Sequence, residues 1–213
     1  MAQKKGGETG VGQRTVNISV MVSGGGSNLQ ALIDGAADGR LAGARIALVL
    51  SSRDGVRALE RARLAGIPTA VVSKADHPDE TEKAGAILAA LAGKKTDLVV
   101  MAGYMSILDK RVCAAYAGRM INIHPALLPK YGGVGYYGLR VHQAVLEAGE
   151  PETGATVHYV DGKSVDSGEI ILQGRVPVAD GDTPESLQAR VLEAEHRIIV
   201  EATAAVVRKL LSR

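Results

Sequence analysis

The sequence predicts a Rossmann-like α/β fold, in which a mostly parallel sheet is flanked by helices. From Thr15 onward, short β-branched runs alternate with Ala- and Leu-rich stretches of helical period, as in parallel βαβ units. After Gly149 the pattern changes to two strands close enough to pair antiparallel, followed by a long C-terminal helix. The 213 residues, 46% hydrophobic and 23% charged, suffice for one sizeable domain.

Each expected element has a local signal. β-branched runs predict strands, and Ala- and Leu-rich segments predict helices. The segment "TPES" supplies an N-cap at Thr183, a proline in the first turn and an early glutamate, so the final helix starts there. The expected strands are 15–22, 44–50, 69–73, 97–103, 119–124, 154–160 and 168–178, and the other expected helices are 27–37, 53–65, 79–93, 106–115 and 139–149.

Residues 1–14 are polar and Gly-rich without a hydrophobic period, so we expect a flexible N-terminal extension. Residues 15–213 contain no internal repeat and no dividing linker, so they are expected to form a single domain.

Composition argues against several classes of protein. A net charge of +2, 3% aromatic residues and no Trp or Phe offer neither a basic footprint nor a stacking platform for nucleic acid. The single cysteine, Cys113, excludes an intrachain disulfide framework, and no apolar N-terminal segment resembles a signal peptide or membrane span. We therefore expect a cytoplasmic protein without a nucleic-acid or membrane partner. A monomer and a homodimer are both compatible with the sequence.

The segment "VMVSGGGSNLQALID" predicts a strand, a glycine turn and an amphipathic helix. Such a turn lets the backbone approach a ligand, and the helix start offers unpaired N–H groups to an anion such as phosphate. It is not a Walker A loop and lacks the full dinucleotide pattern. The alternative is an ordinary tight turn in which Ser27 or Asn28 caps the helix.

The segment "RMINIH" ends in two polar side chains. On a strand, Asn122 and His124 point to one face, at the carboxyl end where open α/β sheets bind ligands. Asn can hold a developing oxyanion, His can move a proton near neutral pH, and Pro125 stops the strand. The pair suits acyl transfer, although either residue can also be a hydrogen-bonded structural residue.

The segment "HYVDGKSVDSGEIILQ" carries two aspartates, Asp161 and Asp166. Either carboxylate could orient an imidazole and raise its pKa, and spacing does not choose between them. The alternative is a turn, because Asp-Gly and Asp-Ser-Gly are favoured turn sequences.

Six segments occur in order between residues 23 and 196: "SGGGSNLQALID", "AGYMSIL", "YAGRMINIHPALLPKY", "GATVHYV", "VDSGEIILQGRVPV" and "EAEH". Together they closely resemble the phosphoribosylglycinamide formyltransferases of purine biosynthesis. The resemblance implies the formyltransferase fold and transfer of a formyl group from 10-formyltetrahydrofolate to the amine of glycinamide ribonucleotide, without a metal. The HP-x-LLP-K-Y signature also occurs in methionyl-tRNA formyltransferase and formyltetrahydrofolate hydrolase, but each of those carries an added domain that this length does not fit.

The resemblance assigns roles residue by residue. It makes Asn122, His124 and Asp166 catalytic, and it selects Asp166 over Asp161. In the mechanism it implies, Asn122 and protonated His124 stabilise the oxyanion, and Asp166 raises the pKa of His124. The other histidines are expected to be structural: His77, His142, His158 and His196. Of these four, His196 is the first candidate for a functional role, because it follows Glu195. The implied ribonucleotide contacts are Gly25, Gly26, Ser27, Asn28 and Glu195, and the implied folate contacts are Met105, Ser106, Ile107, Leu108, Asn122, Val160 and Asp166.

The sequence departs from the family pattern at four points, one of which is a slightly longer aspartate loop from Val160 to Asp166. Gly25 replaces the usual Asn of the first loop, and Ser106 stands where many members carry an arginine beside the folate. The segment from Tyr131 to Gly138, "YGGVGYYG", replaces a common Pro-Gly and leaves the conformation of this loop open.

Two other classes of protein remain as alternatives. A dinucleotide-dependent oxidoreductase would use the same first turn, but Ser51 and Ser52 stand where an acidic residue should hold a ribose. A non-catalytic folate or nucleotide binding module needs the pocket without the catalytic residues.

Overall fold

The computed structural model of the chain describes residues 14–163 and 165–213. Of the expected extension, residues 1–13 lie outside the described residues, and Arg14 donates a hydrogen bond to the Leu210 carbonyl at 3.3 Å. The strands are β1 (Val16–Val22), β2 (Ala44–Ser51), β3 (Thr69–Val71), β4 (Leu98–Met101), β5 (Met120–His124), β6 (Glu152–Tyr159) and β7 (Ile170–Pro177). The helices are α1 (Ser27–Ala37), α2 (Arg57–Leu64), α3 (Glu80–Gly93), α4 (Lys110–Ala115), α5 (Leu139–Glu147) and α6 (Pro184–Leu211).

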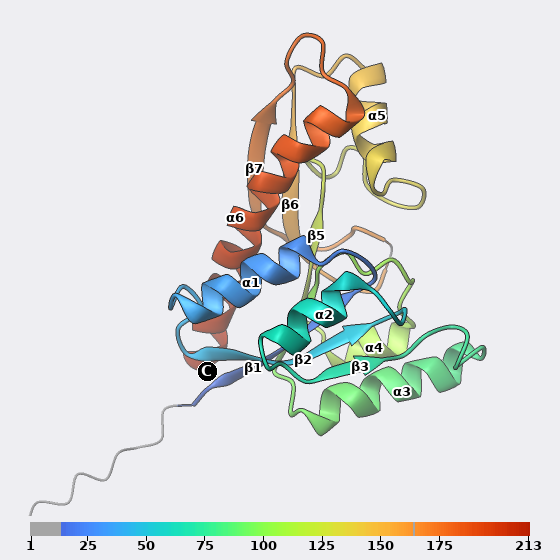
Figure 1. Ribbon diagram of the computed structural model, residues 1–213, viewed down its shortest axis with the longest axis vertical. Helices are drawn as coiled ribbons and strands as arrows, with labels where there is room; N and C mark the ends of the chain where they lie inside the picture. The colour runs from blue at the N-terminus through green and yellow to red at the C-terminus, as the bar shows by residue number, and fades with distance from the viewer. Residues whose placement is uncertain (1–13, 164) are drawn as a thin grey trace, which may run out of the picture.

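The strands form a 7-stranded sheet in the order β3-β2-β1-β4-β5-β6-β7, which confirms the expected α/β class. Strands β1 to β5 are parallel, while β6 is antiparallel to both β5 and β7. Figure 1 shows α1 and α2 together over one face, α3 and α4 on the other side, and the long α6 along β6 and β7. The carboxyl ends of β1, β4 and β5 therefore meet at one edge of the sheet.

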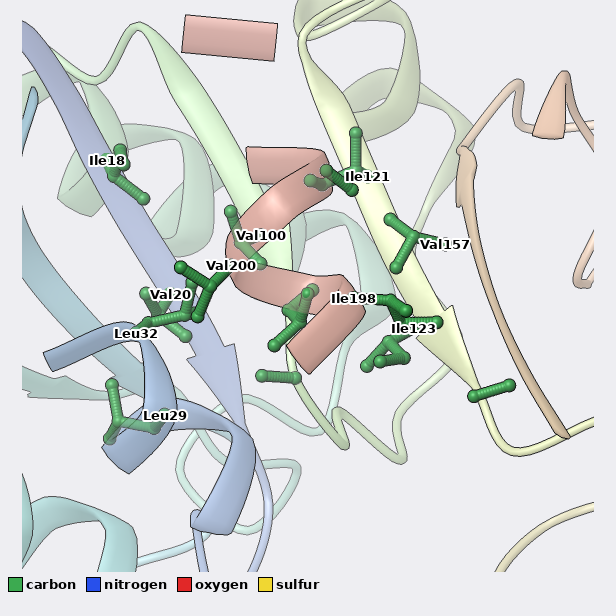
Figure 2. Packing of buried hydrophobic residues seen from close by; sticks show 14 of the residues in the cluster. Ile18, Val20, Leu29, Leu32, Val100, Ile121, Ile123, Val157, Ile198 and Val200 are labelled. Atoms are coloured by element: carbon green, nitrogen blue, oxygen red, sulfur yellow. The ribbon is translucent and has the colours of Figure 1, made fainter. Parts of the chain in front are cut away.

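Alternating side chains divide the core between the two faces of the sheet. Ile18 and Val20 of β1 and Ile121 of β5 belong to the larger cluster, which packs against α1 and α6 (Figure 2). Met21 and Met120, one position along the same strands, belong to the second cluster, beneath α3 and α4. Because side chains of a strand alternate between faces, Asn122 and His124 lie on the same face as Met120.

Helix starts follow their capping residues more closely than their hydrophobic period. At α6 the expected cap is confirmed, since the Thr183 hydroxyl accepts the Ser186 N–H at 3.2 Å. The helix expected over 106–115 is wrong at its start: Asp109 caps α4 by accepting the Arg111 N–H at 2.8 Å. Likewise, the helix expected over 53–65 starts only at Arg57, because Gly55 has a φ of +67°. Residues 53–56 and 106–109 are therefore loops.

The pairing of β6 with β7 requires glycine at position 154. A Cβ there would lie 1.9 Å from the Gly174 carbonyl oxygen, so Gly154→Ala should destabilise the protein by about 2 kcal/mol or more. Gly85→Ala is the matched control, because a Cβ within α3 meets nothing within 4 Å and alanine favours the helix. Urea unfolding measures both, and equal stabilities would contradict this packing.

Candidate active site

The candidate site lies where the carboxyl ends of β1, β4 and β5 adjoin, with β4 between the other two. Ligands of open α/β sheets bind at this edge, at the point where the strand order reverses. Ser23, just after β1, joins the loops there: its hydroxyl lies 2.6 Å from the Ser52 hydroxyl and accepts the Met105 N–H at 2.8 Å. The glycine turn and the loop after β4 are thus tied together.

Pairing between β5 and β6 completes the polar face around Asn122 and His124. In this register Asn122 lies opposite His158, and His124 lies opposite Thr156. Directly opposite residues of an antiparallel pair point to the same face. Four polar side chains from two strands therefore gather on one face of the sheet.

Asp166 reaches this cluster from the loop after β6. Its Oδ2 lies 3.2 Å from His124 Nδ1, and its Oδ1 accepts a hydrogen bond from Asn122 Nδ2 at 3.2 Å. The Gly133 N–H also donates to Oδ2, at 2.9 Å. Asp166 adopts a φ of +55°, which is uncommon for a residue with a side chain and indicates that these contacts hold it there.

Asp161 has a different role. Its carboxylate accepts the Lys163 N–H at 3.0 Å and the Ser167 hydroxyl at 2.6 Å, which makes it part of the turn after β6. The turn interpretation therefore fits Asp161, whereas Asp166 is the aspartate beside His124.

His158 is a site residue that sequence reasoning left out. Its Nδ1 faces the carbonyl oxygens of Tyr159 at 2.9 Å and Ser167 at 3.2 Å, so Nδ1 carries the proton. In the neutral ring Nε2 is then an acceptor, 3.2 Å from Asn122 Nδ2. His158 thereby fixes which way the Asn122 amide faces. The missing signal was the register of β6 on β5, because strand alternation alone does not say which residues lie opposite each other.

Burial and charge act in opposite directions on His124, which is 4% exposed. Burial lowers the pKa of His124 below its ordinary value, and it outweighs the Asp166 carboxylate and the Tyr131 carbonyl, which act to raise it. Asp166 thus acts to raise the His124 pKa, as expected, but the His124 pKa as a whole lies below its ordinary value. For Asp166, burial favours the neutral acid, yet the neighbouring His158 and His124 rings and the Gly133 N–H hold its pKa below the usual range.

The first residues of the loop from Tyr131 to Gly138 contact the cluster of Asn122, His124 and Asp166. The Tyr131 carbonyl lies 2.7 Å from His124 Nε2, and Gly133 bonds to Asp166 as described. The Tyr131 hydroxyl donates to Glu150 at 2.9 Å, which anchors this end of the loop. Both ring nitrogens of His124 therefore face oxygen acceptors, one on the loop and one on Asp166.

At the other end of the site, the glycine turn leads directly into α1. Gly26 is the N-cap, with a φ of +71° and no side-chain capping bond, so neither Ser27 nor Asn28 merely caps the helix. Across the described chain, no acceptor receives the backbone N–H groups of residues 25–28. These N–H groups form the kind of anion site expected at a helix start.

Glu195 of α6 lies beside this turn. Asn28 Nδ2 donates to Glu195 Oε2 at 2.6 Å, and both side chains are buried, with exposed fractions of 8%. Burial raises the pKa of Glu195 to about 7, partly offset by the bond from Asn28. The Asn28 Oδ1 is buried without a hydrogen-bond partner among the described residues. The structure thus brings two of the five predicted ribonucleotide contacts, Asn28 and Glu195, into direct contact and leaves the Asn28 Oδ1 as an acceptor for a ligand donor.

The segment after β4 divides into exposed and packed side chains. Met105 and Ile107 are exposed by 50% and 71%. Leu108 and Val160 instead pack against the core cluster beneath α3 and α4. Of the predicted folate segment, Met105 and Ile107 are therefore the apolar side chains available to a ligand.

Three features of other protein classes are absent from the parts of the chain that the structure describes. Residues 14–163 and 165–213 contain no group of three or more His, Cys, Asp or Glu side chains arranged to hold a metal ion. None of their helices is long and apolar enough to cross a membrane. Strand β2 ends in Ser51, whose hydroxyl donates to the Arg53 carbonyl at 2.6 Å, so no carboxylate stands there to hold a ribose.

Residues 16–203 match the sequence profile described as "Formyl transferase". This chain belongs to the formyl transferase family. It is 41% identical to the phosphoribosylglycinamide formyltransferase of Haemophilus influenzae over 181 residues. The aligned residues cover 85% of this chain and 82% of that protein. The crystal structure of glycinamide ribonucleotide transformylase 1 from Symbiobacterium toebii superposes with a TM-score of 0.86 at 40% identity, covering 92% of this chain and 89% of that chain.

Other formyl transferase relatives are longer proteins. The trifunctional purine biosynthetic protein adenosine-3 of Drosophila melanogaster is 42% identical over 196 residues, which is 92% of this chain but only 14% of that protein. The chain thus corresponds to one part of that relative.

Asp166→Asn tests the assigned pairing with His124. Because the Asp166 carboxylate opposes the effect of burial, its removal should move the His124 pKa further down, while Asp161→Asn should leave it unchanged. NMR titration of the His124 ring in the two variants measures this. An unchanged His124 pKa in Asp166→Asn would reject the pairing, and a large shift in Asp161→Asn would show that the other aspartate acts.

Glu195→Gln tests the buried carboxyl. Between its ordinary pKa of 4.5 and the raised value of about 7, the folded state binds more protons than the unfolded state. Wild-type stability should therefore fall relative to the variant as pH rises through this window, by on the order of 1–3 kcal/mol. Urea unfolding at about pH 5 and pH 8 measures the difference, with the exposed neighbour Glu193→Gln as control. A pH-independent difference would contradict the raised pKa.

Proposed function

We propose that this chain is a phosphoribosylglycinamide formyltransferase of de novo purine biosynthesis. It transfers the formyl group of 10-formyltetrahydrofolate to the amine of glycinamide ribonucleotide and releases tetrahydrofolate. The observation that carries the proposal is the Asp166 carboxylate, which contacts both Asn122 and His124 at the carboxyl edge of the sheet. The Haemophilus influenzae and Symbiobacterium toebii relatives carry the same activity in their names.

The two ends of the site suit the two substrates. The N–H groups of the glycine turn, from Gly25 to Asn28, bind the phosphate of the ribonucleotide. Glu195, held by Asn28, accepts hydrogen bonds from the sugar and glycinamide end. The folate lies along two segments. One is the loop of Met105, Ser106, Ile107 and Leu108, and the other runs from Val160 to Asp166. Met105 and Ile107 present the apolar surface that the pterin end requires.

The chemistry follows from which groups surround the formyl carbon. The substrate amine attacks that carbon, and negative charge develops on the formyl oxygen. The Asn122 amide and protonated His124 stabilise this oxyanion as it forms. As the tetrahedral intermediate collapses, the bond between the formyl carbon and the folate nitrogen breaks. Protonated His124 gives its proton to that departing nitrogen and then takes up the proton that the attacking amine releases.

Both hydrogen atoms of the Asn122 amide are engaged before substrate binds. Its Nδ2 lies 3.2 Å from His158 Nε2 and 3.2 Å from Asp166 Oδ1, at the long end of the range for hydrogen bonds. Exchanging one of these contacts for the formyl oxygen therefore costs little. Similarly, His124 must release the Tyr131 carbonyl before Nε2 can reach the substrate.

The proposal includes small-molecule substrates only, with no nucleic acid, and a cytoplasmic location. Whether the active form is a monomer or a homodimer does not affect the site, because every group invoked above comes from one chain.

The direct test is an assay of the purified chain with 10-formyltetrahydrofolate, with and without glycinamide ribonucleotide. The proposal predicts that loss of the formyl donor requires the ribonucleotide and yields its N-formyl product. Donor loss without the ribonucleotide would indicate a hydrolase, and binding without turnover would indicate a binding module.

Asn122→Ala and His124→Ala test the mechanism within this assay. Each should lower kcat by about 100-fold or more, the usual scale for an oxyanion donor or a proton-transfer group, while the protein remains folded. His77→Ala is the matched control, because His77 lies in the loop before α3, away from the site. Near-normal turnover in both site variants would remove them from the mechanism.

A further inference from the structure

Helix α2 holds the back of the glycine turn through two backbone carbonyls. The Ala58 N–H, in the first turn of α2, donates to the Gly24 carbonyl at 3.1 Å. One turn later, Arg61 Nε donates to the Gly25 carbonyl at 3.0 Å. Two consecutive carbonyls of the turn are therefore bonded to the same helix.

These two bonds decide where the N–H groups of the turn point. In a trans peptide the carbonyl and the following N–H point in opposite directions. When the carbonyls of Gly24 and Gly25 are drawn toward α2, the N–H groups of Gly25 and Gly26 must face away from it. Away from α2 is the open side of the turn, where the phosphate is proposed to bind.

The Arg61 side chain is itself fixed in position. Its Nη1 donates to Gln30 Oε1 at 2.9 Å, so the guanidinium bridges the turn and helix α1. Packing leaves the turn no room to move toward α2, because a Cβ at Gly26 would lie 2.7 Å from Ala58 Cβ. Gly25, by contrast, would have nothing within 4 Å of a Cβ. The turn is thus rigid on the α2 side and open on the other.

From these contacts we propose that Arg61 is a positioning residue for phosphate binding. It holds the Gly25 carbonyl so that the Gly26 N–H is aimed at the anion before the substrate arrives. The inference rests on the proposed function for the identity of the substrate, but the anion site and its dependence on Arg61 do not require turnover. Two donors from a planar guanidinium are needed, so a lysine, which offers a single ammonium group, does not replace it.

The first experiment measures anion binding without catalysis. Ribose 5-phosphate and inorganic phosphate are titrated separately into the ¹⁵N-labelled protein, and the amide resonances of Gly25 and Gly26 are followed. In the wild type both resonances should shift on binding. In Arg61→Met and Arg61→Lys the Kd for ribose 5-phosphate should rise about tenfold, the scale expected for one lost hydrogen bond that orders a binding group.

Arg63→Met is the matched control. Arg63 lies on the same helix and its loss removes the same charge, but it makes no hydrogen bond to the turn among the described residues. This variant should bind ribose 5-phosphate within about twofold of the wild type. Urea unfolding of all variants identifies any that fail to fold, and Arg61→Lys, the milder change, then carries the test.

The second experiment separates the two substrates. In Arg61→Lys the KM for glycinamide ribonucleotide should rise about tenfold, while kcat and the KM for 10-formyltetrahydrofolate stay within about twofold of the wild type. Equal effects on both substrates, wild-type phosphate binding in Arg61→Lys, or equal weakening in Arg63→Met would each overturn the proposal. If the proposed reaction is absent but phosphate binding still depends on Arg61, the proposed function is wrong and the positioning role of Arg61 is confirmed.

Discussion

The register between β5 and β6 is the constraint on which the cluster of Asn122, His124 and Asp166 depends. It sets His158 opposite Asn122 and Thr156 opposite His124, on the face that also receives Asp166. If β6 were shifted by one residue along β5, His158 would point to the other face of the sheet, into the apolar cluster beneath α1 and α6. It would also remove the acceptor that orients the Asn122 amide. The antiparallel end of this mostly parallel sheet therefore shapes the candidate site, because it brings the Asp166 loop back to β5.

The opposite end of the site depends on packing between helices. Helix α2 fixes the glycine turn from behind, and α6 supplies Glu195, whose buried carboxyl is held by Asn28. Ser23 joins this end to the loop after β4 through the Met105 N–H. Two helices and the loop after β4 thus hold one turn. A phosphate that binds there meets N–H groups that are already oriented, so little ordering is needed on binding.

Local signals in the sequence were enough for most of the fold. The alternating strands and helices, the cap at Thr183 and the shared face of Asn122 and His124 all follow from neighbouring residues. What the sequence could not provide was non-local pairing. Local spacing left Asp161 and Asp166 equal, and only the family resemblance paired Asp166 with His124. The place of His158 beside Asn122 and the antiparallel pairing of β6 with β5 depend on residues far apart in the chain. The net pKa of His124 also escaped prediction, because burial is a property of the folded protein.

The central claim is that one site, anchored at the glycine turn and at Asp166, holds both ends of the ribonucleotide. A crystal structure with glycinamide ribonucleotide and a folate analogue that lacks the formyl group tests it most directly. The account predicts phosphate oxygens within hydrogen-bonding distance of the Gly25 and Gly26 N–H groups, and the substrate amine beside Asn122 and His124. A phosphate bound elsewhere, or an amine directed away from the Asp166 cluster, would contradict it.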